Sequence, residues 1–121
     1  MLKIAPCLLA LAVLAAPAFC HHSGSMFDQT KTVTLSGTVA EFQWSSPHAW
    51  IELMVPDAAG KQQEWSIEMG GPSVLFRKGW RPHTLKPGDR ITVKIHPVRS
   101  TVLGGSFLSA KRADGTALHE G

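Results

Sequence analysis

The clearest pattern in this chain is a long alternation of polar and apolar residues that starts at Thr32. At first the apolar residues stand at odd positions, namely Val33, Leu35 and Val39. This period of two is typical of a strand with one buried face. After Ala40 the apolar set moves to even positions, Phe42 and Trp44, as a β-bulge would cause. Gly37 replaces a buried side chain and allows close backbone approach. The pattern predicts a bent, bulged strand over residues 32–44.

Four more segments alternate in the same way, and one short segment is typical of a helix. The predicted strands cover residues 48–57, 61–69, 90–95 and 104–110. Between the third and fourth strands, Pro72 suits the first position of a helix and Gly79 would end it. An immunoglobulin-like sandwich would need about seven strands. Three strands, a short helix and two strands instead match an OB-fold. We therefore predict an all-β, five-stranded OB-like barrel with one short helix between strands 3 and 4.

The first twenty residues have the pattern of a secretory signal peptide. Lys3 precedes an apolar run that extends to Ala16, and small-x-small cleavage patterns follow it. The run is shorter than the ~20 residues needed to span a bilayer. We therefore expect a periplasmic or secreted protein with no transmembrane segment in the mature chain. The expected organisation is a signal peptide at residues 1–20, an extended amino-terminal arm at 21–30 and the barrel at 31–118.

Cysteine and charge content narrow the classes of function. The chain has two cysteines, and cleavage removes at least Cys7, so the mature domain has no internal disulfide and depends on its hydrophobic core. The formal net charge is +3, and the basic residues are scattered with no run beyond two. Scattered charge in an exported protein is more typical of solvated surface than of a nucleic-acid site. On these grounds we expect no nucleic-acid partner.

Short motifs along the chain carry a family resemblance. They are His21-His22-Ser23, Met26-Phe27-Asp28, Leu35-Ser36-Gly37-Thr38-Val39, Trp44-Ser45-Ser46-Pro47-His48, Pro72-Ser73 with Leu75, Gly79-Trp80, and Leu85-Lys86-Pro87-Gly88-Asp89. In these motifs the chain resembles a family of small exported bacterial proteins of unknown function. It departs from that family at Ser46, where members usually have Asn, and at Gly71, where they have Ser. The resemblance implies export and a small β domain, and it supplies no reaction or ligand.

Histidines beside the predicted cleavage site suggest a metal site. Cleavage after Cys20 would leave His21 with a free amine and an imidazole, next to His22, and His48 could lie nearby in the fold. Nitrogen donors of this kind suit Cu(II), Ni(II) or Zn(II), with copper favoured by affinity. Cleavage after Ala18 would instead keep the thiol of Cys20. We therefore name His21, His22 and His48 as candidate metal ligands, with copper as the candidate ion. The alternative is an arm whose histidines bind nothing.

A second candidate surface combines Trp44, Trp50 and Met54 with His48. Thioethers such as those of Met26, Met54 and Met69 suit Cu(I), and a tryptophan face can cover a cation. The alternation places Met69 on the core face, where methionine is ordinarily filler. Trp50 and Met54 fall on the outward face, where an apolar patch is typical of an interaction surface. The alternative to a metal-binding module is therefore a metal-free protein-interaction or envelope accessory domain with an envelope protein as its partner.

Catalytic signals are weak throughout the chain. Glu52, Glu64 and Glu68 fall on polar faces of predicted strands, where solvated carboxylates are common. The sequence has no glycine-rich phosphate loop before a long helix and no serine in an elbow motif. His83, His96 and His119 lack the paired spacing of a structural zinc site. We therefore expect a non-enzymatic binding module.

Overall fold

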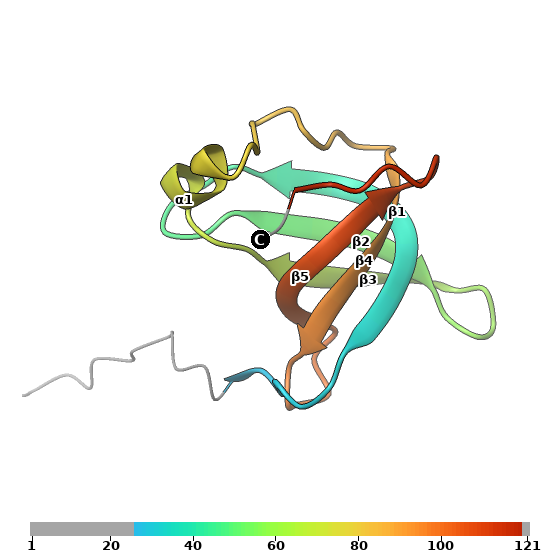
Figure 1. Cartoon of the computed structure of the whole chain (residues 1–121). Coiled ribbons are helices and arrows are strands. Elements are labelled where there is room, and N and C mark those ends of the chain that lie inside the picture. Colours follow the sequence, from blue (N-terminus) through green and yellow to red (C-terminus); the bar gives the residue numbers. More distant parts are fainter. Residues whose placement is uncertain (1–25, 120–121) are drawn as a thin grey trace, which may run out of the picture.

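Five strands form a closed barrel in residues 26–119, the part of the chain that the computed structural model describes (Figure 1). The elements are β1 (Val33–Gln43), β2 (Trp50–Pro56), β3 (Gln62–Glu68), α1 (Pro72–Arg77), β4 (Arg90–Pro97) and β5 (Gly104–Arg112). The strand order around the barrel is β1-β2-β3-β5-β4. Neighbouring strands are antiparallel except β3 and β5, which are parallel. The predicted OB-like barrel with one short helix between β3 and β4 is confirmed.

The first strand closes the barrel because it bends and pairs on both sides. Residues 33–38 pair with β4, and residues 38–43 pair with β2. The register against β2 shifts between Val39 and Glu41, so Ala40 is the extra residue of the predicted bulge. Figure 1 shows β1 curving around one side of the barrel. The local change of phase in the sequence is therefore the cause of the closed architecture.

Gly37 lies where β1 crosses β2. A Cβ atom at this position would collide with the backbone carbonyl oxygen of Met54. Because a backbone carbonyl cannot rotate away as a side chain can, only a residue without Cβ fits here without moving a strand.

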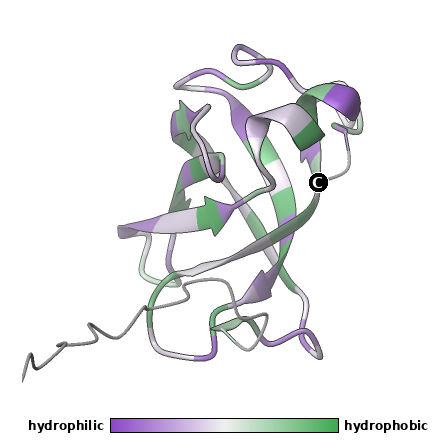
Figure 2. Ribbon diagram, turned by 90° about the vertical axis from the view of Figure 1, so that its left-hand side faces the viewer, coloured by the Kyte–Doolittle hydropathy of each residue, from purple (hydrophilic) through white to green (hydrophobic). Residues whose placement is uncertain are grey.

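The barrel interior follows the predicted alternation (Figure 2). Its fully buried side chains include Val39, Ile51, Leu53, Ile67, Val93 and Ile95. Phe42 and Trp44 pack against this core, as the shifted phase predicts. Trp80 is completely buried behind α1, with its ring centroid 5.9 Å from that of Phe42 and 5.6 Å from that of Phe107. Gly79, with φ of 100°, ends the helix as predicted.

Each strand differs from the sequence prediction by one or two residues at one end or both, and two of these differences have a clear structural cause. The pattern predicts a second strand from residue 48, but β2 begins at Trp50 because the Ser45 hydroxyl donates to the His48 carbonyl (2.9 Å) and closes a corner there. The pattern also ends the fourth strand at Ile95, whereas β4 continues to Pro97, which pairs with Gly105. A local turn sets the first boundary, and pairing with another strand sets the second.

Replacing Gly37 by alanine tests the strand crossing. We expect Gly37→Ala to lower the free energy of unfolding by about 1–3 kcal/mol, because the new methyl group forces backbone apart. Gly70→Ala is the matched control, since a Cβ there has its nearest neighbour at 3.8 Å, an ordinary contact. Urea denaturation of both variants measures the difference. Equal stability of the two would show that the crossing has room for a side chain.

Candidate functional site

The corner between β1 and β2 is fixed to the segment that follows β3. The Ala49 N–H donates to the Gly70 carbonyl (3.0 Å), and the Met69 N–H donates to the Ala49 carbonyl (2.9 Å). These bonds hold His48 beside the last residue of β3, Glu68. The corner is therefore part of the rigid barrel and not a loose loop.

The imidazole of His48 has a defined orientation. Its Nδ1 lies 2.8 Å from the Met69 carbonyl oxygen and 3.4 Å from Oε1 of Glu68. A carbonyl oxygen only accepts hydrogen bonds, so Nδ1 carries the proton in this arrangement. In the neutral ring the lone pair then belongs to Nε2.

Two neighbouring hollows share His48 and Glu68. The first has a volume of about 340 Å³ and is lined by Met26, Ser45, Ser46, Pro47, His48, Trp50 and Glu68. We call it the His48 pocket. The second, of about 290 Å³, adds Phe27, Met69 and Phe107 to the same two residues. An imidazole and a carboxylate thus sit in largely apolar surroundings, next to a thioether and an indole.

The end of the amino-terminal arm is docked beside this pocket. Phe27 forms a β-bridge with Val98. The Asp28 N–H donates to the Pro97 carbonyl (2.8 Å), and the Arg99 N–H donates to the Met26 carbonyl (3.0 Å). These backbone bonds place Met26 in the His48 pocket.

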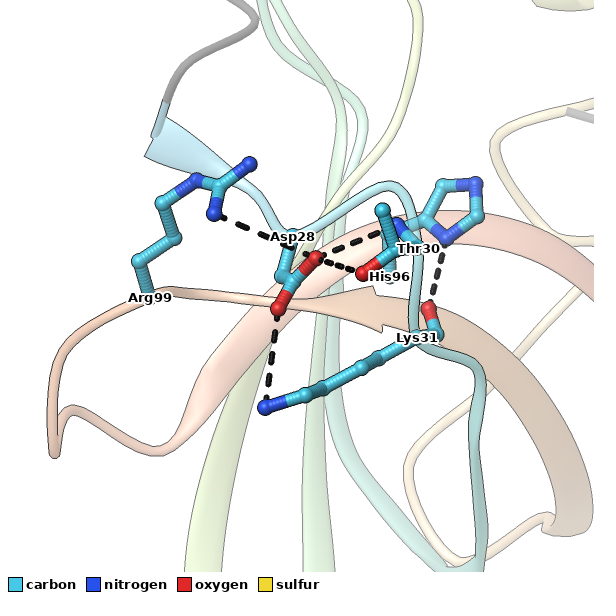
Figure 3. Close-up of polar contacts among 5 residues, drawn as sticks. All are labelled: Asp28, Thr30, Lys31, His96 and Arg99. Atoms are coloured by element: carbon cyan, nitrogen blue, oxygen red, sulfur yellow. Dashed lines mark hydrogen bonds and ion pairs between the residues drawn. The ribbon is translucent and has the colours of Figure 1, made fainter.

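Asp28 secures the docked arm (Figure 3). Its carboxylate accepts from the Thr30 hydroxyl (2.6 Å) and the Thr30 N–H (3.1 Å), and it lies 3.6 Å from Nζ of Lys31 and 3.9 Å from Nη1 of Arg99. The bond from the Thr30 hydroxyl is the largest cause that lowers the pKa of Asp28 below its ordinary value, followed by the bond from the Thr30 N–H. His96 adds a bond from Nδ1 to the Lys31 carbonyl (2.8 Å). The arm is thus held by both backbone and side chains.

Acidic residues gather on the outer face of β2, β3 and the second half of β1. In the register, Glu41 stands opposite Glu52, Trp50 opposite Glu68, and Met54 opposite Glu64. The Ser66 hydroxyl donates to Glu52 (2.6 Å). Strands β1, β2 and β3 contain no lysine or arginine, whereas β4 and β5 contain four. Charge that looks scattered in the sequence is therefore segregated by the strand order.

The structure brings together only some of the residues singled out from the sequence. His48 and Trp50 share the pocket with Met26. Trp44 is turned instead toward Phe42, with the two rings edge to face and their centroids 5.9 Å apart. Met54 lines a separate groove of about 470 Å³ with Arg90 and others. His21 and His22 lie outside the described residues.

Glu68 is the pocket residue that sequence reasoning passed over. The alternation of the third strand predicts only that Glu68 is a solvated carboxylate on a polar face. The available signal is the hairpin register, because pairing back from the turn around residues 57–60 sets Trp50 opposite Glu68. Within residues 26–119, no group of three or more His, Cys, Asp or Glu side chains is placed to hold a metal ion. In the same range, no helix has the length and apolar content to cross a membrane.

Comparisons with known proteins place the chain in a family and a fold. The family described as "Family of unknown function (DUF6152)" matches residues 9–107. A search of curated proteins gives no match. Among solved structures, a crystal structure of the mitochondrial single-stranded DNA binding protein Rim1 from S. cerevisiae is similar, with 12% identity and a TM-score of 0.50, covering 75% of this chain and 96% of that one. A selenomethionine-labelled form gives 14% identity and a TM-score of 0.47, covering 75% and 97%.

This likeness corrects one expectation. The exclusion of nucleic acid as a partner, drawn from scattered charge and expected export, was wrong, because the barrel has the fold of a protein that binds single-stranded DNA. The reason for the error is physical: charge counts and motifs along a chain do not show which barrel face the strand order assembles. At 12% identity the likeness establishes the fold alone, so it removes the ground for excluding nucleic acid and does not identify a ligand of this chain.

Removing the Asp28 carboxylate tests the docking of the arm. We expect Asp28→Ala to make the amides of Asp28 and Arg99 exchange about tenfold faster, because their bonds to the barrel then open locally. Asp114→Ala is the matched control, since Asp114 makes the same type of turn with Thr116 (2.8 Å to its N–H) far along the chain. Hydrogen exchange by NMR measures both.

The same contact has a pH dependence with a definite sign. The pKa of Asp28 is lowered in the folded protein. The ionised carboxylate therefore stabilises the docked arm fully above the ordinary aspartate pKa of about 3.9, and this stabilisation is lost as the pH falls through the lowered pKa. If the amides of residue 28 and Arg99 exchange at the same rate in Asp28→Ala as in the unmodified protein at neutral pH, backbone hydrogen bonds alone hold the arm.

Proposed function

The chain belongs to the family of unknown function DUF6152, and we propose that it is an exported, non-catalytic module that binds a transition-metal ion, copper first, in the His48 pocket. The observation that carries this proposal is the position of Met26. It lines the same pocket as His48 and Glu68, and in the sequence it follows His22 by four residues. The described end of the arm thus lies beside the one histidine of the β1–β2 corner, which supports the proposal that the preceding histidines join it.

The orientation of His48 suits metal binding. Metal-ligating histidines ordinarily donate their second ring N–H to a backbone carbonyl or carboxylate, which fixes the tautomer and aims the other nitrogen. The hydrogen bond from Nδ1 to the Met69 carbonyl (2.8 Å) is of this kind, and Oε1 of Glu68 lies 3.4 Å from the same nitrogen. In this proposal Nε2 of His48 binds the ion.

The other donors of the pocket favour copper over harder ions. The thioether of Met26 is a soft donor that selects Cu(I), and imidazoles suit both copper oxidation states. Four residues of chain span at most about 14 Å, so His21 and His22 have the reach to supply further nitrogen donors. Cleavage after Cys20 would add the amine of His21.

The electrostatics of the outer face support a cationic ligand. Glu41, Glu52, Glu64 and Glu68 lie on one face, on strands without lysine or arginine. Like charges on one side of a small protein raise the local concentration of counter-ions there. Trp50 lines the pocket on this face and presents an aromatic surface of the kind that covers a cation.

The geometry supports a binding role over a catalytic one. Ser45 and Ser46 line the pocket beside His48, which invites comparison with a serine nucleophile. However, the Ser45 hydroxyl donates to the backbone carbonyl of His48 (2.9 Å) and not to its ring. A serine becomes a nucleophile when an adjacent base takes its proton. We therefore propose no reaction for this site.

A metal-free interaction domain is the second candidate function. It is favoured by the apolar lining of the pocket, where Met26 and Trp50 could receive a side chain of an envelope protein. Export is common to both candidates, and both rest on the predicted signal peptide. Metal titration separates them, because only the first requires His48 as a ligand.

Copper titration of the exported, processed protein tests the proposed function. Intact mass first establishes the amino terminus, and competition with a chelator then measures affinity for Cu(I) and Cu(II). We expect one ion per chain and a loss of more than about tenfold in affinity for His48→Ala, because a ligand is removed. Met26→Leu should weaken Cu(I) more than Cu(II).

His83→Ala is the matched control, because His83 is exposed and does not line the pocket. Equal affinity of the His48 and His83 variants would reject the pocket as the site. No binding by the unmodified protein would reject the metal-binding function and leave the interaction domain.

A further inference from the structure

The short helix α1 exposes apolar side chains that the core does not use. Among residues 26–119, four large apolar side chains are exposed: Met26, Val74, Phe76 and Val102. Two of them belong to the six residues of α1, with Val74 at 40% and Phe76 at 53% of full exposure. Leu75 between them is the residue that α1 buries. Val74 and Phe76 therefore flank the buried stripe and project from either side of the helix.

The stretch of sequence that contains these side chains is basic and has no acidic residue. Between Glu68 and Asp89 the sequence has no acidic residue and four basic ones, which are Arg77, Lys78, Arg81 and Lys86. The guanidinium carbon of Arg81 lies 3.6 Å from the centroid of the Phe76 ring. Nη1 of Arg81 also donates to the carbonyls of Phe76 (3.0 Å) and Trp80 (2.7 Å). A cation is thus held directly against the exposed ring.

The position of α1 leaves this surface accessible. Figure 1 shows α1 at one end of the barrel, outside the strands, and Figure 2 shows hydrophobic and hydrophilic residues side by side on it. The four glutamates of the β1–β3 face belong to strands, and none stands on α1 or the segment after it. The molecule therefore has one acidic face and one cationic, partly apolar end.

We propose that α1 and the residues up to Arg81 dock the protein reversibly on an anionic lipid bilayer. Phe76, the more exposed of the two, enters the boundary between headgroups and acyl chains, while Arg77, Lys78 and Arg81 face lipid phosphates. Apolar side chains beside lysine and arginine are the pattern of elements that lie in a membrane interface. A second copy is a poor occupant, because it would bring like charges together. The inference goes beyond the proposed metal site and does not depend on it.

Vesicle co-sedimentation of the metal-free, processed protein tests this docking. The probes are vesicles of phosphatidylcholine alone and of phosphatidylcholine with phosphatidylglycerol. We expect binding to the anionic vesicles only, weaker at high salt because exposed charges are screened. Neutralising Arg77 and Lys78 with Arg77→Gln and Lys78→Gln should weaken binding about fivefold per charge. Phe76→Ser should weaken it as well.

Val102→Ser is the matched control, because Val102 is 65% exposed but lies in the loop between β4 and β5. A Phe76→Trp variant gives an independent readout: compared with the unmodified protein, which has four tryptophans, its emission should shift to shorter wavelength with anionic vesicles only. Equal binding by the Phe76→Ser and Val102→Ser variants, or no binding to anionic vesicles, would overturn the proposal. Because no metal is present, a negative copper titration leaves this result unaffected, and the reverse also holds.

Discussion

The rest of the structure depends on one strand that serves two sides of the barrel. β1 pairs with β4 through its first half and with β2 through its second, and the bulge at Ala40 provides the change of direction. The crossing is tight enough that a Cβ atom at position 37 would collide with the Met54 carbonyl oxygen. Because a single strand joins both edges, the two ends of β1 are fixed relative to each other. The arm that precedes β1 and the corner that follows it are therefore also held in fixed positions on the barrel.

Both neighbours of β1 contribute to the candidate site. At its carboxyl end, the corner that carries His48 is bonded to the end of β3. At its amino end, the arm that carries Met26 is held by Asp28 against the end of β4. The same closure assembles β1, β2 and β3 into one acidic face, and most basic residues of the described chain lie on β4, on β5 or in the segment from α1 to Lys86. The strand order therefore determines both the positions of the site residues and the distribution of charge around the barrel.

Most of the fold is readable from local periodicity, and most of the site is not. The bulge, the helix start at Pro72 and its end at Gly79 leave signals within a few residues of themselves. Alternation also assigns Trp50 and Met54 correctly to one face, but it does not say that four residues of strand separate them by about 13 Å. Only Trp50 therefore meets His48. The docking of Phe27 on Val98 joins distant segments and has no local signature.

Native-state hydrogen exchange across β1 tests the central claim most directly. If one strand closes the barrel, amides in residues 33–38 and in residues 39–43 should open with the same free energy, equal to that of global unfolding, as denaturant is raised. A separate opening of lower free energy for the half that pairs with β4 would contradict this. The barrel would then be a β1–β3 sheet with a detachable edge, and the arm and the corner would no longer be fixed to a common frame.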